Sequence, residues 1–136
     1  LTEARIGSLT FAGRPAAAFH AAVSQPEPGR LSAALRLTLT TPESLTLVYP
    51  SSQDYDLVLW NEQGKPIYRW SDGQAFTQAT RARDISGGLA HDVDIQTSEP
   101  LPDGAYVLEA WLTAGPASRA FSSMTPFRIQ DGRITQ

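Results

Sequence analysis

The sequence predicts an all-β protein, an immunoglobulin-like antiparallel β-sandwich of about seven to nine strands. Apolar and polar residues alternate with a period of two in one segment after another, which is typical of strands with one buried face. Ten Gly and ten Pro are scattered along the chain, and clusters of turn-forming residues separate the alternating segments. A length of 136 residues suits one domain, so residues 1–136 are expected to form a single sandwich.

The first strands are predicted in the N-terminal third of the chain. Residues 31–40 (LSAALRLTLT) alternate cleanly, and after a turn that contains Pro42, residues 45–49 begin a second strand. Residues 15–23 (PAAAFHAAV) are Ala-rich, which suits a helix, but their alternation suits a strand equally well. We favour the strand because a sandwich needs that partner. Residues 1–14 are expected to form an extra strand or an extended arm.

The central segment predicts a β-hairpin. Residues 54–60 alternate, residues 61–64 (NEQG) supply a turn in which Gly64 can adopt positive φ, and residues 65–70 return. Pro66 lies near the start of the returning segment. Because proline donates no hydrogen bond to a neighbouring strand, this segment is expected at a sheet edge or with an unpaired first residue.

The remaining strands are separated by two long connections. Residues 74–83 are expected to be a loop that contains a short strand, because Phe76 is the only large apolar residue among them. Residues 98–104 (SEPLPDG) predict a turn-rich connection stiffened by proline, and residues 114–120 predict a loop. Alternation predicts three more strands, at residues 89–95, 105–113 and 121–129.

Charge and composition exclude several kinds of partner. The net charge is -3 and the sequence pI is about 5.2, whereas phosphate binding needs a basic excess, so no nucleic acid is expected. The chain has no Cys, so it forms no disulfides or thiolate metal sites, and we expect no cofactor. No segment approaches the roughly 18 apolar residues of a membrane helix. The compartment stays open between cytoplasm and periplasm, as does the oligomeric state.

Residues that could carry catalysis are scarce. His91 occupies an inward-facing strand position, where a satisfied core or interface histidine is the expected state. Asp92 and Asp94 point away from His91, so the three cannot hold one ion. Asp54 and Asp56 share a face, but nothing predicts that either is buried as acid–base catalysis would require. Without a nucleotide-binding, hydrolase or metalloprotease motif, we expect no catalytic residues, no metal site and no enzyme.

The aromatic residues allow two interpretations. Three Trp and four Tyr would form a binding platform if they were exposed. We expect most of them to fill the core instead, as Trp commonly does in sandwich folds.

Residues 45–78 (LTLVYPSSQDYDLVLWNEQGKPIYRWSDGQAFTQ) are more distinctive, and they resemble the signature region of the BsuPI family of bacterial intracellular proteinase inhibitors. The resemblance extends over residues 31–127, and residues 101–112 are similar to a later glycine–tyrosine strand of the family. This chain has Ser52 where the family often has Gly, and residues 41–43 where it often has Asn. The matching residues are Tyr49, Ser52, Gln53, Tyr55, Asp56, Gly64, Tyr68, Trp70, Ser71, Phe76, Gln78, Gly104 and Tyr106.

We expect the signature residues to serve the fold rather than to bind a partner. Ser52, Gln53 and Asp56 can form hydrogen bonds to turn backbone, and Trp70 and Ser71 can lock the end of the hairpin to the next loop. Binding residues are then expected in loops that the signature does not mark.

The resemblance implies a proteinase inhibitor directed at a serine protease of the subtilisin type. A rigid sandwich would present a preorganised exposed loop to the protease cleft, which lowers the entropy cost of binding. Two loops are candidates, although ordinary turns explain both equally well. The alternative is a non-inhibitory interaction or envelope-associated immunoglobulin-like module, since such sandwiches often act only by binding. The candidate contact residues are Pro100, Leu101 and Pro102 in the first loop, and Pro116, Ala117, Ser118 and Arg119 in the second.

Overall fold

Every regular element of the computed structural model is a β-strand, in the residues that the structure describes: 8–11, 14–27, 29–114 and 121–135. No helix in this part of the chain is long and apolar enough to cross a membrane. The strands are β1 (Ser8–Phe11), β2 (Arg14–Glu27), β3 (Arg30–Leu39), β4 (Leu45–Tyr49), β5 (Tyr55–Trp60), β6 (Pro66–Arg69), β7 (Arg81–Ile85), β8 (Gly88–Ile95), β9 (Gly104–Leu112), β10 (Phe121–Gln130) and β11 (Arg133–Thr135).

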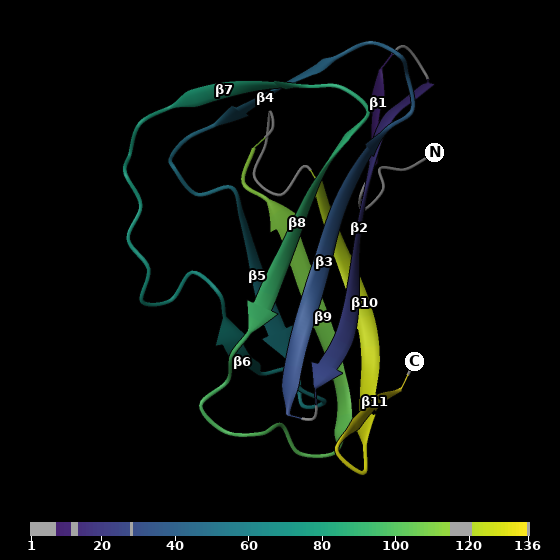
Figure 1. Ribbon diagram of the computed structural model, residues 1–136, viewed down its shortest axis with the longest axis vertical. Coiled ribbons are helices and arrows are strands. Elements are labelled where there is room, and N and C mark those ends of the chain that lie inside the picture. The colour runs from purple at the N-terminus through teal and green to yellow at the C-terminus, as the bar shows by residue number, and fades with distance from the viewer. Residues whose placement is uncertain (1–7, 12–13, 28, 115–120, 136) are drawn as a thin grey trace.

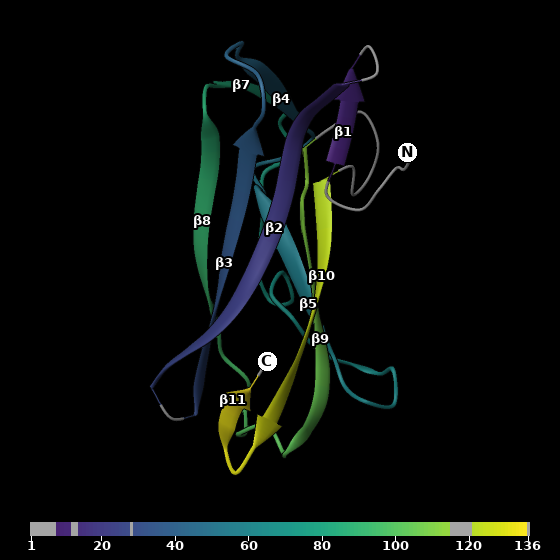
Figure 2. The same cartoon turned by 90° about the vertical axis from the view of Figure 1, so that its right-hand side faces the viewer.

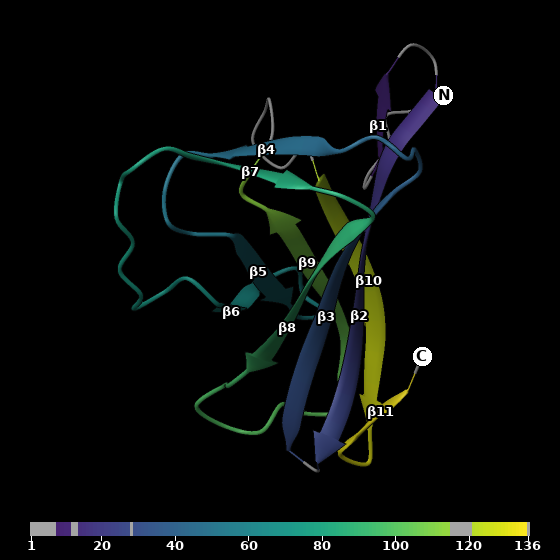
Figure 3. The ribbon, with the colours of Figure 1, turned by 45° about the horizontal axis from the view of Figure 1, so that its top comes forward.

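Two antiparallel sheets pack face to face, as Figures 1 and 2 show. One has the strand order β1-β2-β3-β8 and the other the order β11-β10-β9-β5-β6. The sheets meet along β2 and β10, where the Thr125 hydroxyl donates a hydrogen bond of 2.7 Å to the Ala21 carbonyl. On the opposite side, β8 and β6 are the last strands of their sheets. The two-stranded β4–β7 ribbon crosses one end of the sandwich (Figure 3).

The core lies between the two sheets and is formed by the alternating residues that the sequence predicts. In β3, residues 31, 33, 35 and 37 are buried, and in β9 residues 106, 108, 110 and 112 face them across the interior. β5 and the C-terminal half of β9 differ from β3 because residues on both of their faces are buried. Leu57 and Leu59 belong to the core, whereas Asp56 and Val58 are buried outside that cluster.

The all-β sandwich is confirmed, and residues 15–23 form part of a strand, as their alternation favours. Pro66 begins β6, at the edge of its sheet, as predicted. The structure contains eleven strands in its described part instead of seven to nine. The prediction that residues 121–129 form the last strand is wrong, because Asp131 and Gly132 turn the chain into β11. Both residues have positive φ, 54° and 76°, as a two-residue type I′ turn requires.

Gly88 marks a close approach between β8 and β3. A Cβ atom at this position would lie 2.5 Å from the Leu37 carbonyl oxygen, a backbone atom that cannot move independently of β3. Gly88→Ala is therefore expected to lower the free energy of unfolding by about 2 kcal/mol, as overpacked positions do. Urea denaturation measures the change, and the exposed neighbour Ser86→Ala is the control. Equal stability of the two variants would contradict this packing.

Candidate functional site

The buried carboxylate of Asp56 is the centre of the signature residues. Its side chain is only 2% exposed. One oxygen accepts hydrogen bonds from the backbone N–H groups of Leu57 (2.9 Å) and Ser71 (3.1 Å). The other accepts from the Ser71 hydroxyl (2.7 Å) and from Arg69 Nε (2.9 Å). Asp56 thus fixes the point where the chain leaves β6, and its lone pairs are occupied within the protein.

The signature residues before β5 hold the connection between β6 and β7. Ser52 exchanges two hydrogen bonds of 2.9 Å with the backbone of Thr77, one through its N–H and one through its hydroxyl. The Gln53 side chain donates to the Tyr55 carbonyl at 2.9 Å. Arg81 donates to the Ser51 carbonyl at 2.9 Å and forms an ion pair with Asp54. The long connection is therefore tied to the body of the sandwich at several points.

Aromatic side chains of the signature pack in a row beside these hydrogen bonds. The ring centroids of Tyr55 and Trp70 are 4.6 Å apart, and those of Trp70 and Phe76 are 6.0 Å apart. His91 lies on the other side of Tyr55, with ring centroids 4.8 Å apart. This row gives the β6–β7 connection an apolar support.

Not all of the aromatic residues enter the core. Tyr49 and Tyr106 are core residues, and Tyr55, Tyr68 and Trp70 pack against it. Trp60 and Trp111 lie outside the core cluster: the indole of Trp60 donates to Glu109 at 3.1 Å, and Arg69 lies 5.6 Å above the Trp111 ring.

The connection between β8 and β9, which contains Pro100, Leu101 and Pro102, is fixed by three sets of hydrogen bonds. The Thr97 hydroxyl donates to the Glu99 carbonyl at 2.6 Å. The Tyr106 hydroxyl donates to the Pro102 carbonyl at 2.5 Å, the arrangement known as a tyrosine corner in immunoglobulin-like domains. The Asp103 carboxylate accepts from the backbone N–H groups of residues 131 and 132 at 2.8 and 3.1 Å.

The three candidate residues of this loop differ in exposure. Pro100 and Pro102 are exposed, whereas Leu101 is half-buried and packs against the core. Leu101 therefore anchors the loop to the core. Burial also raises the pKa of Tyr106, so its phenol keeps the proton that it donates to Pro102. The second candidate set, residues 116–119, lies outside the described residues.

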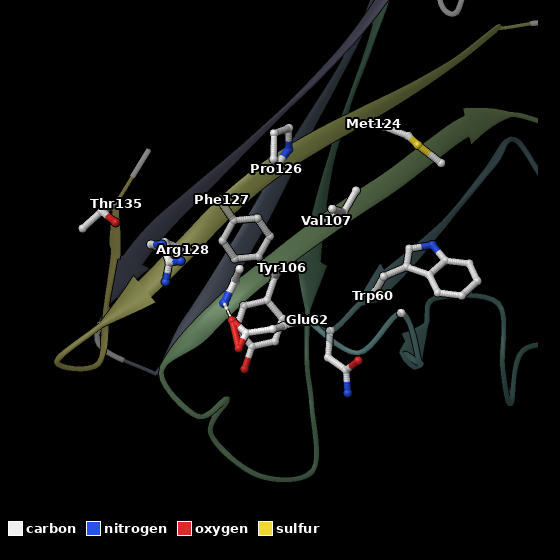
Figure 4. A pocket seen from close by; sticks show the side chains of 12 residues that line it. Trp60, Glu62, Tyr106, Val107, Met124, Pro126, Phe127, Arg128 and Thr135 are labelled. Atoms are coloured by element: carbon white, nitrogen blue, oxygen red, sulfur yellow. Dashed lines mark hydrogen bonds between the residues drawn. The ribbon is translucent and has the colours of Figure 1, made fainter.

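An apolar groove of about 800 Å³ lies on the outer face of the five-stranded sheet. Figure 4 shows Trp60 and Met124 toward one end of this groove and Glu62 and Arg128 toward the other. The Met124 side chain is 55% exposed. The groove was not predicted, because alternation does not show which strands share an outer face.

Each of the acidic residues in the 54–56 and 92–94 segments has a basic partner. Arg36 pairs with Asp92 at 2.9 Å, and Arg30 pairs with Asp94 at 3.2 Å. Among the described residues, no group of three or more His, Asp or Glu side chains is arranged to hold a metal ion. Asp54 and Asp56 bind different arginines, Arg81 and Arg69.

His91 faces inward as predicted, but it is not satisfied. Its Nε2 atom is buried and has no hydrogen-bond partner in the described part of the protein. Burial lowers the pKa of His91 below its usual value of 6.5, an effect that the nearby Asp54 partly opposes. The imidazole is consequently expected to be neutral where it packs on Tyr55.

The pKa of His91 makes stability depend on pH. Because the folded-state pKa lies below the unfolded value, the unfolded chain binds more protons as the pH falls through about 6.5. His91 thus makes its full contribution to stability at pH values above its unfolded-state pKa. This contribution is lost as the pH falls from the unfolded-state pKa to the lower folded-state pKa. The free energy of unfolding, measured by urea denaturation, should fall less between about pH 7.5 and about pH 5 for His91→Gln than for wild type. The exposed His20→Gln control should behave like wild type; equal losses in all three proteins would contradict the prediction.

Comparison with protein families identifies the chain. The family model BsuPI, described as an intracellular proteinase inhibitor, matches residues 18–117. Because the match covers most of the sequence, the chain belongs to this family. The matched segment begins in β2 and includes the signature region together with the 96–103 connection. A search of curated proteins found no match.

Proposed function

From membership of the BsuPI family, we propose that this protein inhibits a serine protease of the subtilisin type without catalysing a reaction itself. We further propose that the loop of residues 98–104 enters the protease cleft. The observation that carries this assignment is an exposed loop held rigidly in place. Thr97, Tyr106 and Asp103 provide tethers on either side of the exposed residues Ser98, Glu99, Pro100 and Pro102.

Rigidity favours inhibition over cleavage for a physical reason. A loop that is already ordered loses little conformational entropy on binding, so more of the contact energy appears as affinity. Two peptide bonds of this loop precede a proline, which lacks the amide proton and restricts the residue before it. The half-buried Leu101 contributes by packing on the core, which resists opening of the loop.

The second loop remains part of the proposal. Pro116, Ala117, Ser118 and Arg119 are proposed as an additional contact, on the basis of their sequence alone: small side chains, one proline and one arginine.

The test is a titration of subtilisin with the purified protein, followed by hydrolysis of a small peptide substrate. We expect protease activity to fall linearly to near zero at one equivalent, with the inhibitor intact or cut at one loop bond. A zinc metalloprotease serves as the specificity control and should keep its activity. Full subtilisin activity in the presence of excess protein would contradict the proposal.

The apolar groove favours a second candidate function, a non-inhibitory interaction module. Its exposed Met124 and the neighbouring Val107 and Pro126 suit an apolar segment of a partner protein. This candidate function predicts effects of substitutions opposite to those expected for an inhibitor that binds through the 98–104 loop. Met124→Asp would abolish partner binding, and changes in residues 98–103 would leave binding intact.

A further inference from the structure

We propose that Ile67, in the edge strand β6, is the apolar side chain by which this protein engages the protease, on a surface shared with the 98–104 loop. This inference rests on the proposed inhibitory function. A subtilisin-type cleft accepts apolar side chains, and Leu101 is the apolar residue that the loop itself offers. Leu101 packs against the core, however, so using it would require the tethered loop to open.

Three large apolar side chains are exposed in the described part of the chain: Val48 (49%), Ile67 (39%) and Met124 (55%). Val48 belongs to β4, which pairs with β7 in the ribbon at one end of the sandwich. Met124 belongs to β10, between β9 and β11 in the strand order of its sheet. Of the three, Ile67 alone lies in the last strand of a main sheet. One backbone edge of β6 has no neighbouring strand among the described residues.

The backbone around Ile67 is irregular at this position. Leu59 pairs with Tyr68 and Trp60 pairs with Pro66, so Ile67 is an extra residue with no partner in β5. Such bulges are enriched at sheet edges and beside functional sites, where they redirect a side chain. Tyr68 packs against the core, and the neighbouring Ile67 is exposed. Lys65, Pro66 and Arg69 are of the residue types that usually protect a sheet edge, and Ile67 is the large apolar side chain that is exposed among them.

The position of Ile67 also connects it to the proposed contact loop. A cavity of about 490 Å³ is lined on one side by Ile67 and its β6 neighbours, and on the other by residues 96–102. Asp72 completes the lining next to β6. The edge strand and the loop thus form the two walls of one depression, and a protease that contacts the loop reaches β6 as well.

The strand is held firmly enough to act as a preformed contact. Arg69 donates to Asp56 at 2.9 Å and covers the Trp111 ring, while the Trp70 N–H donates to the Leu57 carbonyl at 3.0 Å. An extended segment of the protease can pair with the free edge of β6 through backbone hydrogen bonds, and the Ile67 side chain then fills an apolar pocket. Pro66 lacks an N–H group, so the donors for such pairing begin at Ile67.

The test compares three variants that place the same charge at the three exposed apolar positions: Ile67→Asp, Val48→Asp and Met124→Asp. The inhibition constant toward subtilisin should rise at least about 100-fold for Ile67→Asp and less than about threefold for the other two. Circular dichroism and thermal unfolding establish that each variant is folded. Ile67→Ala adds no charge, and it should weaken inhibition about tenfold even if the aspartate disturbs the strand.

The outcomes separate this inference from the proposed function. If wild type inhibits and both Ile67 variants inhibit equally well, Ile67 is not the contact, while the inhibitory function stands. If Met124→Asp or Val48→Asp is instead the variant that loses inhibition, the protease contacts another face, and the inference is wrong. If wild type does not inhibit subtilisin at all, the proposed function and this inference fail together.

Discussion

Asp56→Ala is expected to lower the free energy of unfolding by about 3 kcal/mol, the largest effect that we predict for a polar residue. The carboxylate accepts hydrogen bonds from the Ser71 N–H and hydroxyl, and hydrogen bonds to a charged group contribute about 1.5–3 kcal/mol each. The ion pair with Arg69 adds little, because the Arg69 side chain is half-exposed and water screens it. Most of the loss comes from the N–H groups of Leu57 and Ser71 and from the Ser71 hydroxyl, which lose the oxygen that accepts from them.

Urea denaturation of Asp56→Ala beside Asp72→Ala measures this effect. Asp72 is exposed, and its replacement removes the same charge, so its stability should stay within about 0.5 kcal/mol of wild type. In Asp56→Ala we also expect faster hydrogen exchange at residues 71–74, because the turn after β6 loses its attachment. Equal stability of the two variants would show that Asp56 does not hold this connection.

Tyr106→Phe is expected to turn a rigid contact loop into a flexible one. The substitution removes only the hydroxyl that donates to the Pro102 carbonyl, so stability should fall by about 1–2 kcal/mol. We expect the inhibition constant toward subtilisin to rise about tenfold, because the loop must then be ordered on binding. The loop should also be cleaved faster, which electrophoresis of the incubated mixture detects.

Tyr49→Phe is the matched control for this prediction. The Tyr49 hydroxyl is buried, and it has no hydrogen-bond partner in the described part of the protein. Removing it should leave stability unchanged or slightly increased, because a buried unsatisfied group is destabilising. If Tyr49→Phe weakened inhibition as much as Tyr106→Phe, the effect would not come from the loop tether.

The sequence predicts the sheets of this protein better than it predicts their edges and outer faces. Alternation identifies the core residues of β3 and β9 correctly, and Pro66 indicates the edge position of β6. Strand β11 was missed although Asp131-Gly132 is a strong hairpin signal, because only three residues follow in the strand. The bulge at Ile67 has no signature in the alternation pattern, since it depends on the register with β5.

Burial on the second face of β5 could not be predicted either. Alternation places Asp56 opposite the core, a position that is normally exposed to solvent. The structure buries it because Arg69 and Ser71 from the neighbouring strand and turn close over it. In the same way, proline content identified the 98–104 connection as stiff, but only the fold shows that Leu101 turns inward. Such contacts join residues that are distant in the sequence.

Hydrogen exchange on the complex tests the central claim most directly. The protein is mixed with subtilisin whose catalytic serine is replaced by alanine, so that binding is measured without cleavage. We predict slower exchange at the amides of Glu99, Leu101 and Asp103, and at those of Ile67 and Arg69 in β6. No protection in either segment, or protection confined to β10 around Met124, would contradict the assignment of the contact surface.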